Sequence, residues 1–345
     1  MSKTEIKRIV NTEGKIKSFE EIGISTKTVI GISNLVIDLD KLYNYIPITE
    51  FSPLEKKRGR KKRLVNEPTV KILPVGSIIL VQRRREHRGV LLKNKSKRSN
   101  TFFLHQVTIV LVLENNKFIN IKVSSNGKFQ ITGCKSEKHY IDCMMHLFSN
   151  MRRIQEMTGE TCFRLSNSES QLRIVFNTVM KNMDFNIGFN ISREKLDRFI
   201  NSNTEFNSIF EGSISTGVNV KVQSEQINDV ELIQLNYDII ENKKEVLKVP
   251  YQNYFNLLEE KEKKKESNKD KYHTFLIFAS GSIIMSSRGP DMKRVFYELI
   301  DILIKNRTNF EDRTIEEEKI VKEIVPIKNK IEDEIDDEIE EEIEA

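Results

Sequence analysis

Residues 272–287 read YHTFLIFASGSIIMSS and predict a β-hairpin. Two apolar runs flank the turn Ala279-Ser280-Gly281, where glycine supplies the positive φ that tight hairpin turns need. A helical pattern follows as far as Asn306. A weaker copy of this strand-turn-strand-helix unit runs from Ile119 to Met151, and its Gly127 lies 154 positions before Gly281. A unit that occurs twice indicates an internal duplication.

The same offset relates segments farther upstream. Lys41-Leu42 falls on Lys195-Leu196 at the heads of two helical patterns. The stretch GSIILVQ at 76–82 resembles GVNVKVQ at 217–223, displaced by 141 positions, so each copy carries an insert at a different place. We therefore divide the chain into a polar N-terminal extension at 1–25, a first repeat at 26–155 with a basic insert at 55–63, a second repeat at 156–310 with a charged insert at 256–271, and an acidic tail at 311–345.

Charge is divided unevenly along the chain. The tail from Glu311 to Ala345 holds 16 acidic and 5 basic residues, a net charge of −11, and the rest of the chain carries +16. A body this basic needs a polyanionic partner or an internal counterweight, and nucleic acid and the tail are the two candidates. Isoleucines four apart from Ile327 to Ile343 are typical of an apolar stripe on an anionic helix, but a disordered solubilising tail explains them equally well.

Three cysteines without paired spacing indicate a reducing compartment. No apolar run is long enough to span a bilayer, and the polar N-terminus is not a signal peptide, so we expect a soluble intracellular protein with no membrane partner.

His139, Cys143 and His146 fall on one helical face with Cys134 nearby, but their counterparts in the second repeat are not ligands, and we expect no metal.

Catalytic motifs are also missing from the sequence. It contains no phosphate-binding Gly-x-x-x-x-Gly-Lys loop, no His-Glu-x-x-His pair and no Gly-x-Ser-x-Gly elbow. We therefore expect no enzyme and no cofactor.

Strands and helices in each repeat predict an α+β fold. Tandem repeats of this kind would build one long sheet of mainly antiparallel strands with helices on one face, so that the other face stays uncovered. Strand alternation then assigns side chains to the two faces. The predicted core residues are Phe275, Ile277, Ile283 and Met285 in the second hairpin and Ile121, Val123, Phe129 and Ile131 in the first. The predicted uncovered residues are Leu276, Phe278, Ile284 and Ser286 in the second hairpin and Asn120, Lys122, Ser124, Gln130 and Thr132 in the first.

The two hairpins resemble those of the TATA-box-binding protein family, most of all the divergent TATA-binding-like proteins of large DNA viruses. In that family two tandem pseudo-twofold repeats form one curved antiparallel sheet, a saddle, whose concave face lies in the DNA minor groove and whose convex face carries the helices. The resemblance implies the same architecture for this chain. Each repeat ends in a hairpin of the type I-F-S-S-G-K-x-x-x-T-G-A-K, followed by a long helix. The first repeat here reads VSSNGK at 123–128 and ITGCKSE at 131–137, and the second reads IFASG at 277–281 and MSS at 285–287.

The resemblance implies groove-binding roles for individual residues. Phe278 matches the family's wedge phenylalanine, and Leu276 and Ile284 match its apolar groove-facing positions. Thr132 and Ser286 match its small-hydroxyl position. Thr28 and Asn182 lie where the family places a groove-reading asparagine.

The wedge position of the first hairpin is Ser124 by strict alignment, or Val123 if Asn126 is an inserted residue; we prefer Ser124, because Val123 is needed in the core. A second wedge in each repeat would be Leu73 and either Phe206 or Phe210. The second repeat would then wedge the DNA, and the first would grip it through polar and basic groups.

Two basic clusters are candidates for phosphate contacts. Arg83, Arg84, Arg85 and Arg88 lie at a strand end where the family grips phosphates, whereas the seven basic residues within 56–63 form an exposed arm or a nuclear-import signal.

We therefore expect a DNA-binding general transcription initiation factor that binds and bends double-stranded, A·T-rich promoter DNA in its minor groove. Transcription factors or RNA polymerase subunits are the expected protein partners. The place of action would be the site of viral transcription in the host cell, cytoplasm or nucleus, or the virion. The alternative is a TATA-binding-like scaffold that binds transcription proteins with little or no DNA recognition.

Overall fold

The computed structural model describes residues 7–9, 16–51, 72–91, 105–166, 171–213, 216–225, 230–267 and 271–312. The basic insert at 55–63 and the isoleucine stripe of the tail lie outside these ranges. No helix within them is long and apolar enough to cross a membrane.

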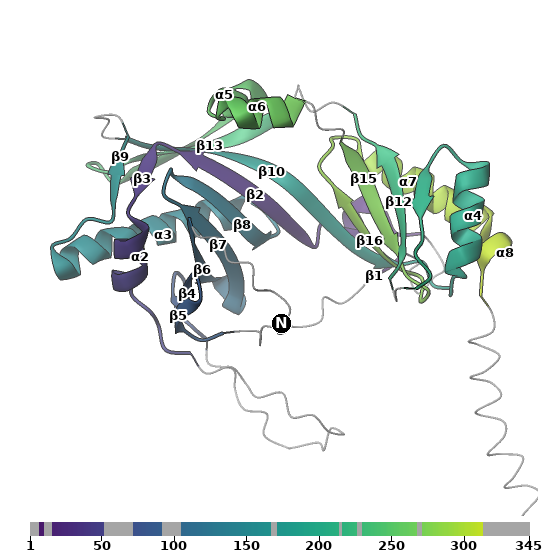
Figure 1. The fold of residues 1–345 in the computed structure, drawn as a ribbon, viewed down its shortest axis with the longest axis horizontal. Coiled ribbons are helices and arrows are strands. Elements are labelled where there is room, and N and C mark those ends of the chain that lie inside the picture. The colour runs from purple at the N-terminus through teal and green to yellow at the C-terminus, as the bar shows by residue number, and fades with distance from the viewer. Residues whose placement is uncertain are drawn as a thin grey trace, which may run out of the picture.

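Fourteen strands of the described residues form one sheet, and its central pair is β2 (Thr26–Ser33) with the long β10 (Gln171–Asn186) (Figure 1). Outward from β2 lie β8 (Lys128–Cys134), β7 (Lys117–Ser124), β6 (Gln106–Leu113), β4 (Ile78–Arg83) and β5 (Glu86–Gly89). Outward from β10 lie β16 (Ser282–Ser287), β15 (Tyr272–Ile277), β12 (Val218–Gln223) and β11 (Asn207–Ile209). The neighbouring strands on these paths are antiparallel, which confirms the α+β fold with a large antiparallel sheet. The saddle curvature stays a prediction.

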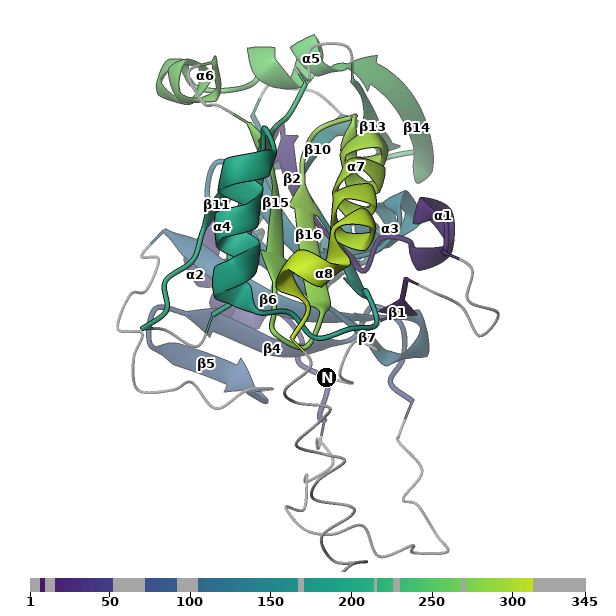
Figure 2. The ribbon, with the colours of Figure 1, turned by 90° about the vertical axis from the view of Figure 1, so that its right-hand side faces the viewer.

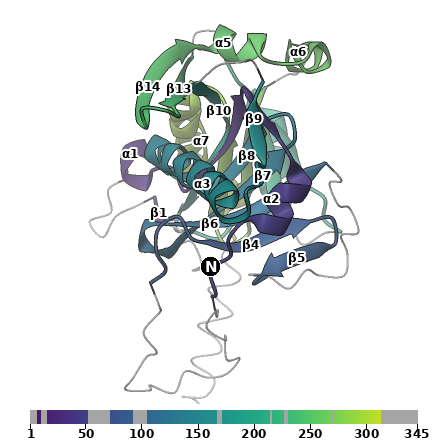
Figure 3. The same cartoon turned by 90° about the vertical axis from the view of Figure 1, so that its left-hand side faces the viewer.

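Each half of the sheet buries an apolar core beneath its helices. In the first half α3 (Glu137–Thr158) and α2 (Leu39–Tyr45) pack on the strands (Figure 3). In the second half the core lies under α4 (Arg193–Asn203), α7 (Met292–Lys305), α8 (Arg307–Phe310) and α1 (Phe19–Ile22) (Figure 2). The remaining short elements are β1 (Lys7–Arg8), parallel to β10, the pair β3 (Leu35–Ile37) and β9 (Phe163–Leu165), and a 3-10 turn at Glu114–Asn116.

The alternation at Asn182–Ile191 predicts one continuous strand, which is wrong for its second part. β10 ends at Asn186, yet Ile187, Phe189 and Ile191 stay buried in the core of the second half. Ser192, a residue type that favours helix N-caps, occupies that position before α4, although its side chain makes no capping hydrogen bond.

The two hairpins dock on the chain in the same way. The Ile37 amide donates to the Ser125 carbonyl and the Ile191 amide donates to the Ala279 carbonyl, both at 2.8 Å. The acceptors are 154 positions apart, and so are the donors. A second such pair joins Ser33 to Gly127 and Ile187 to Gly281, at 3.1 and 3.0 Å. This recurrence supports the duplication at 26–155 and 156–310, which we keep as a proposal.

The segment before the second hairpin, which includes the charged insert at 256–271, contains two strands and two short helices. β13 (Glu231–Asp238) pairs with the start of β10 and with β14 (Lys243–Pro250), and α5 (Tyr251–Asn256) and α6 (Glu260–Ser267) follow. Tyr254 and Leu258 pack on Ile32 and Val175, whose neighbours in β2 and β10 face the core. The expectation that the sheet face opposite α3 and α7 is bare is therefore wrong over the central strands.

Candidate nucleic-acid interface

We call the side of the sheet opposite α3 and α7 the open face. The predicted core residues of both hairpins are at most 1% exposed, which confirms the assignment of the two faces: Phe275, Ile277, Ile283, Met285, Ile121, Val123, Phe129 and Ile131. Because side chains alternate along a strand, the residues between them point to the open face.

In the second half, two rows of side chains cross the open face. Ile284, Leu276 and Asn219 are neighbours across β16, β15 and β12, and Ser286, Thr274 and Lys221 form the next row. All six are half-buried. Leu276 and Ile284 belong to none of the apolar clusters of the described residues, so this part of the open face carries an apolar surface beside hydroxyl and amide groups.

Phe278 lies in the turn that joins β15 to β16. Its amide donates to the Ser282 carbonyl at 2.9 Å, and its carbonyl accepts from the Gly281 amide at 3.0 Å. The ring is half-buried and, like Leu276, lies outside the apolar clusters of the described chain. Phe278 is thus held in a fixed turn at the end of the apolar rows.

In the first half, the corresponding rows are polar. Gln130 of β8 lies between Ile30 of β2 and Lys122 of β7, and Thr132 lies between Thr28 and Asn120. Thr28 is 8% exposed and the others are half-buried, apart from the exposed Asn120. Ser124, at the expected wedge position, accepts a hydrogen bond from Gln106 at 3.3 Å. This half offers hydrogen-bonding groups and an ammonium group where the other half offers apolar ones.

Two asparagines of the open face carry buried side-chain oxygens without a hydrogen-bond partner among the described residues. They are Asn182, which pairs with Ser286 across β10 and β16, and Asn219. A buried polar atom without a partner costs about 1 to 3 kcal/mol. Asn182 is predicted from the sequence as a groove-reading residue, whereas Asn219 is not. The alternation of apolar and polar residues in GVNVKVQ would have placed Asn219 on the open face.

The predicted phosphate-binding arginines surround the turn from β4 to β5. Arg83 forms an ion pair with Asp40, and Arg88 donates to the Tyr43 carbonyl at 2.6 Å, so both hold α2 against the sheet. Arg84 and Arg85 are exposed in the turn itself. Their exposure places these two side chains where a ligand in solution can reach them.

The candidates for second wedges do not point outward as wedges must. Leu73 is 3% exposed and packs with Ile79, Leu80, Val110 and Val112. Phe206 lies in the core of the second half, and the Arg193 guanidinium lies over the Phe210 ring, 5.0 Å from its centroid. Leu73 and Phe206 as wedges are therefore wrong.

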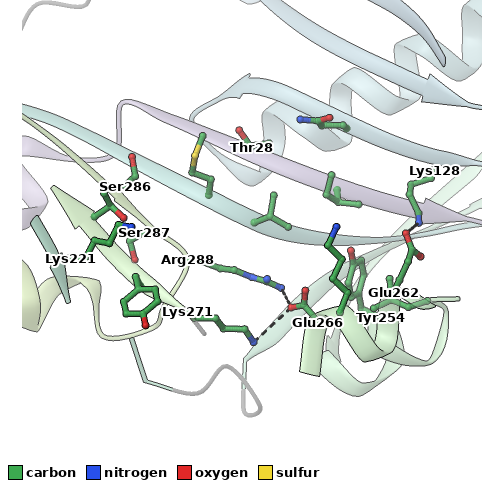
Figure 4. A pocket seen from close by; sticks show the side chains of 18 residues that line it. Thr28, Lys128, Lys221, Tyr254, Glu262, Glu266, Lys271, Ser286, Ser287 and Arg288 are labelled. Carbon is green, nitrogen blue, oxygen red and sulfur yellow. Dashed lines mark hydrogen bonds and ion pairs between the residues drawn. The ribbon is translucent and has the colours of Figure 1, made fainter. Parts of the chain in front are cut away.

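A cleft of about 760 Å³ lies between the open face and α6 (Figure 4). Its lining includes five basic residues, Lys128, Lys221, Lys265, Lys271 and Arg288, and two acidic ones, Glu262 and Glu266. Glu262 pairs with Lys128 at 2.5 Å, and Glu266 pairs with Arg288 at 2.5 Å. This cleft is not predictable from the sequence, because a run of charged residues with no apolar periodicity resembles a solvated linker.

A buried polar network lies at the end of β16. The His273 ring bonds Ser287 Oγ through Nδ1 at 2.7 Å and Asp291 Oδ1 through Nε2 at 2.8 Å. The ring is 0% exposed and both nitrogens are engaged, so it ties β15 to the start of α7 and leaves no face for a substrate. The candidate metal ligands are not assembled either: Cys134 and Cys143 are buried in the first core, His139 accepts from the Lys135 amide, and the described residues contain no metal-binding group of three.

No family model matches the chain. It is 26% identical over 289 residues to an uncharacterized protein, 335L, of Invertebrate iridescent virus 6, covering 81% of this chain and 82% of that protein. It is 32% identical over 122 residues to a TATA-box-binding protein-like protein of Acanthamoeba polyphaga mimivirus, covering 32% of each. Among solved structures, Methanococcus jannaschii TBP matches with a TM-score of 0.39 and 11% identity over 82% of this chain and 98% of that one, a score too low to support an argument. The similarity to a TATA-binding-like protein of a large DNA virus is thus confirmed.

Proposed function

We propose that the chain is a DNA-binding general transcription initiation factor that binds A·T-rich promoter DNA in its minor groove and bends it. The observation that carries this proposal is the second half of the open face, where Leu276, Ile284 and Phe278 lie outside every apolar cluster of the described residues, beside Ser286 and Asn219. Apolar side chains unstack a base step, and hydroxyls and amides hydrogen-bond the acceptors of A·T pairs. The name of the mimivirus relative, TATA-box-binding protein-like, supports the same role.

The two halves would act differently on the duplex. Phe278 would wedge a base step from the second half. The first half would grip the groove without a wedge, through Lys122, Ser124, Gln130 and Thr132, with Thr28 and Asn182 at the central strands. Phosphates would meet the β4–β5 cluster of Arg83, Arg84, Arg85 and Arg88, where Arg83 would exchange Asp40, and Arg88 the Tyr43 carbonyl, for a phosphate oxygen.

The partners follow from this role. Both viral relatives come from large DNA viruses, so we propose that the chain acts where viral DNA is transcribed, with transcription factors or RNA polymerase subunits. The role is one of binding, without catalysis.

The test is an electrophoretic titration against A·T-rich and G·C-rich duplexes. We expect tighter, salt-dependent binding to the A·T-rich duplex and about a tenfold loss for Phe278→Ala, which removes about 1 to 2 kcal/mol of stacking on a base. Ile240→Ala removes an apolar side chain that is 82% exposed in the β13–β14 turn and should change nothing. Two equal kinks in a bend assay would contradict the single wedge.

The scaffold that binds transcription proteins with little DNA recognition remains the second candidate. The specific observation in its favour is that α5 and α6 cover the central strands of the open face. If a folded wild-type chain and all its variants shift no duplex, and a polymerase subunit binds in the same buffer, the scaffold is the better description.

A further inference from the structure

The helix α6 bridges the two halves of the open face through its carboxylates. Glu262 pairs with Lys128 at the first residue of β8, and Glu266 pairs with Arg288 directly after β16 (Figure 4). Glu266 also lies 3.7 Å from Lys271 and accepts a hydrogen bond from the Tyr251 hydroxyl at 3.0 Å. One short helix thus engages cations from both halves of the sheet.

These ion pairs are partly shielded from water. The side chains of Arg288 and Glu266 are 14% and 20% exposed, and that of Lys128 is 25% exposed. Burial alone would raise the pKa of Glu266, but the hydrogen bond and charge of Arg288, with the Tyr251 hydroxyl and the charge of Lys271, outweigh it, and the pKa is lowered. The carboxylate is therefore ionised at neutral pH and matched to its partners.

The two helices of the insert are held in different ways. In α5, Tyr251 and Tyr254 are 6% and 5% exposed and pack on the central strands. In α6 no residue is buried, and the sequence EKEKKKES offers no apolar side chain to pack. Since α6 is held by charge, an incoming polyanion can replace its carboxylates without opening an apolar core.

We infer that Lys128 and Arg288 form a binding site for the DNA phosphate backbone, and that α6 fills this site with Glu262 and Glu266 when DNA is absent. This inference rests on the proposed function and assigns phosphate contacts that lie on the open face itself, unlike the β4–β5 arginines. Binding then exchanges two carboxylate contacts for two phosphate contacts, and α6 moves off the sheet.

The experiment compares two double variants that each remove two negative charges from the same helical region. Glu262→Gln with Glu266→Gln breaks the contacts to the sheet, whereas Glu259→Gln with Glu260→Gln changes two exposed residues, of which Glu260 pairs with Lys263 in the same helix. With the A·T-rich duplex at low salt, we expect the first pair to bind about three- to tenfold more tightly than the second, since ion pairs that are only partly shielded from water contribute modestly. Lys128→Ala with Arg288→Ala should bind more weakly than wild type.

A second measurement follows α6 directly. Backbone hydrogen exchange of residues 260–267 should become faster when saturating duplex is added, while that of β15 does not. If both double variants bind duplex like the wild type, or exchange in α6 is unchanged by DNA, the inference is wrong and the proposed function stands. If no protein in the series binds duplex, the proposed function fails and the inference fails with it.

Discussion

Gly281 sets the position of the turn that carries Phe278, and replacing it with alanine should disturb both stability and DNA binding. Its φ is +72°, a region that glycine occupies readily and other residues rarely. An added Cβ would lie 2.1 Å from the carbonyl oxygen of Phe189, far inside van der Waals contact. The obstacle is backbone, so the hairpin itself has to move.

The size of the effect follows from these contacts. A left-handed conformation costs an alanine about 1 kcal/mol. Movement of the hairpin also weakens the hydrogen bonds from Ile187 to Gly281 and from Ile191 to Ala279, each worth about 1 kcal/mol. The expected loss for Gly281→Ala is therefore about 3 kcal/mol. Gly159 has the same φ, +72°, with nothing within 4 Å of an added Cβ, so Gly159→Ala should cost only about 1 kcal/mol.

Urea unfolding of the two variants and the wild type measures this difference. The titration against A·T-rich duplex, run on protein that is still folded, should show weaker binding for Gly281→Ala and unchanged binding for Gly159→Ala. If Gly281→Ala costs no more than Gly159→Ala, the close approach to Phe189 does not anchor the hairpin and the reasoning is refuted.

Two other changes test charge. Asp291→Asn should lower the free energy of unfolding by about 2 kcal/mol at pH 7, because the carboxylate accepts from His273 and from Arg294. Burial would raise the pKa of Asp291, but His273 and Arg294 outweigh it and the pKa is lowered. The stabilisation is therefore present above the pKa of an unfolded aspartate, and the gap in urea titrations should close as the pH falls through the lowered pKa of the folded protein. Truncation after Asp312 removes 14 acidic and 5 basic residues, a net charge of −9. It should tighten nonspecific DNA binding at low salt, measured in a filter-binding titration. Unchanged affinity would show that the tail does not compete with DNA for the basic part of the chain.

Much of the sheet is predictable because its residues interact locally or alternate regularly. Phe275, Ile277, Ile283 and Met285 repeat every second position around a glycine turn, so their pattern determines both the hairpin and its buried side. The alternation from Asn182 to Ile191 predicts a strand over its whole length, but β10 ends at Asn186. The alternation continues because Phe189 and Ile191 still pack in the core after the strand has ended.

The interface was harder to predict because its contacts join distant parts of the chain. Glu262 and Lys128 are 134 positions apart, and nothing in EKEKKKES signals which carboxylate faces a sheet. Arg83 looked like a phosphate ligand by its place in a basic cluster, but its partner Asp40 comes from a helix 43 positions earlier. A cluster of charged residues in a sequence indicates that their side chains have partners of opposite charge. Only the fold shows whether such a partner is another residue of the chain or a bound ligand.

The asymmetry of the open face has a structural basis beyond the missing wedge. On the outer strands of the first half, Val110 and Val112 are covered by Leu73 with Phe51 and Phe118. At the centre, α5 covers Ile32 and Val175. Between these two covered regions, the first half exposes only a polar strip of the sheet. In the second half, no described residue covers Leu276 and Ile284 in this way. A duplex that unstacks on Phe278 would therefore meet apolar surface on one side of the central strands and hydrogen-bonding groups on the other, so the second half should supply most of the bending and the first half most of the grip.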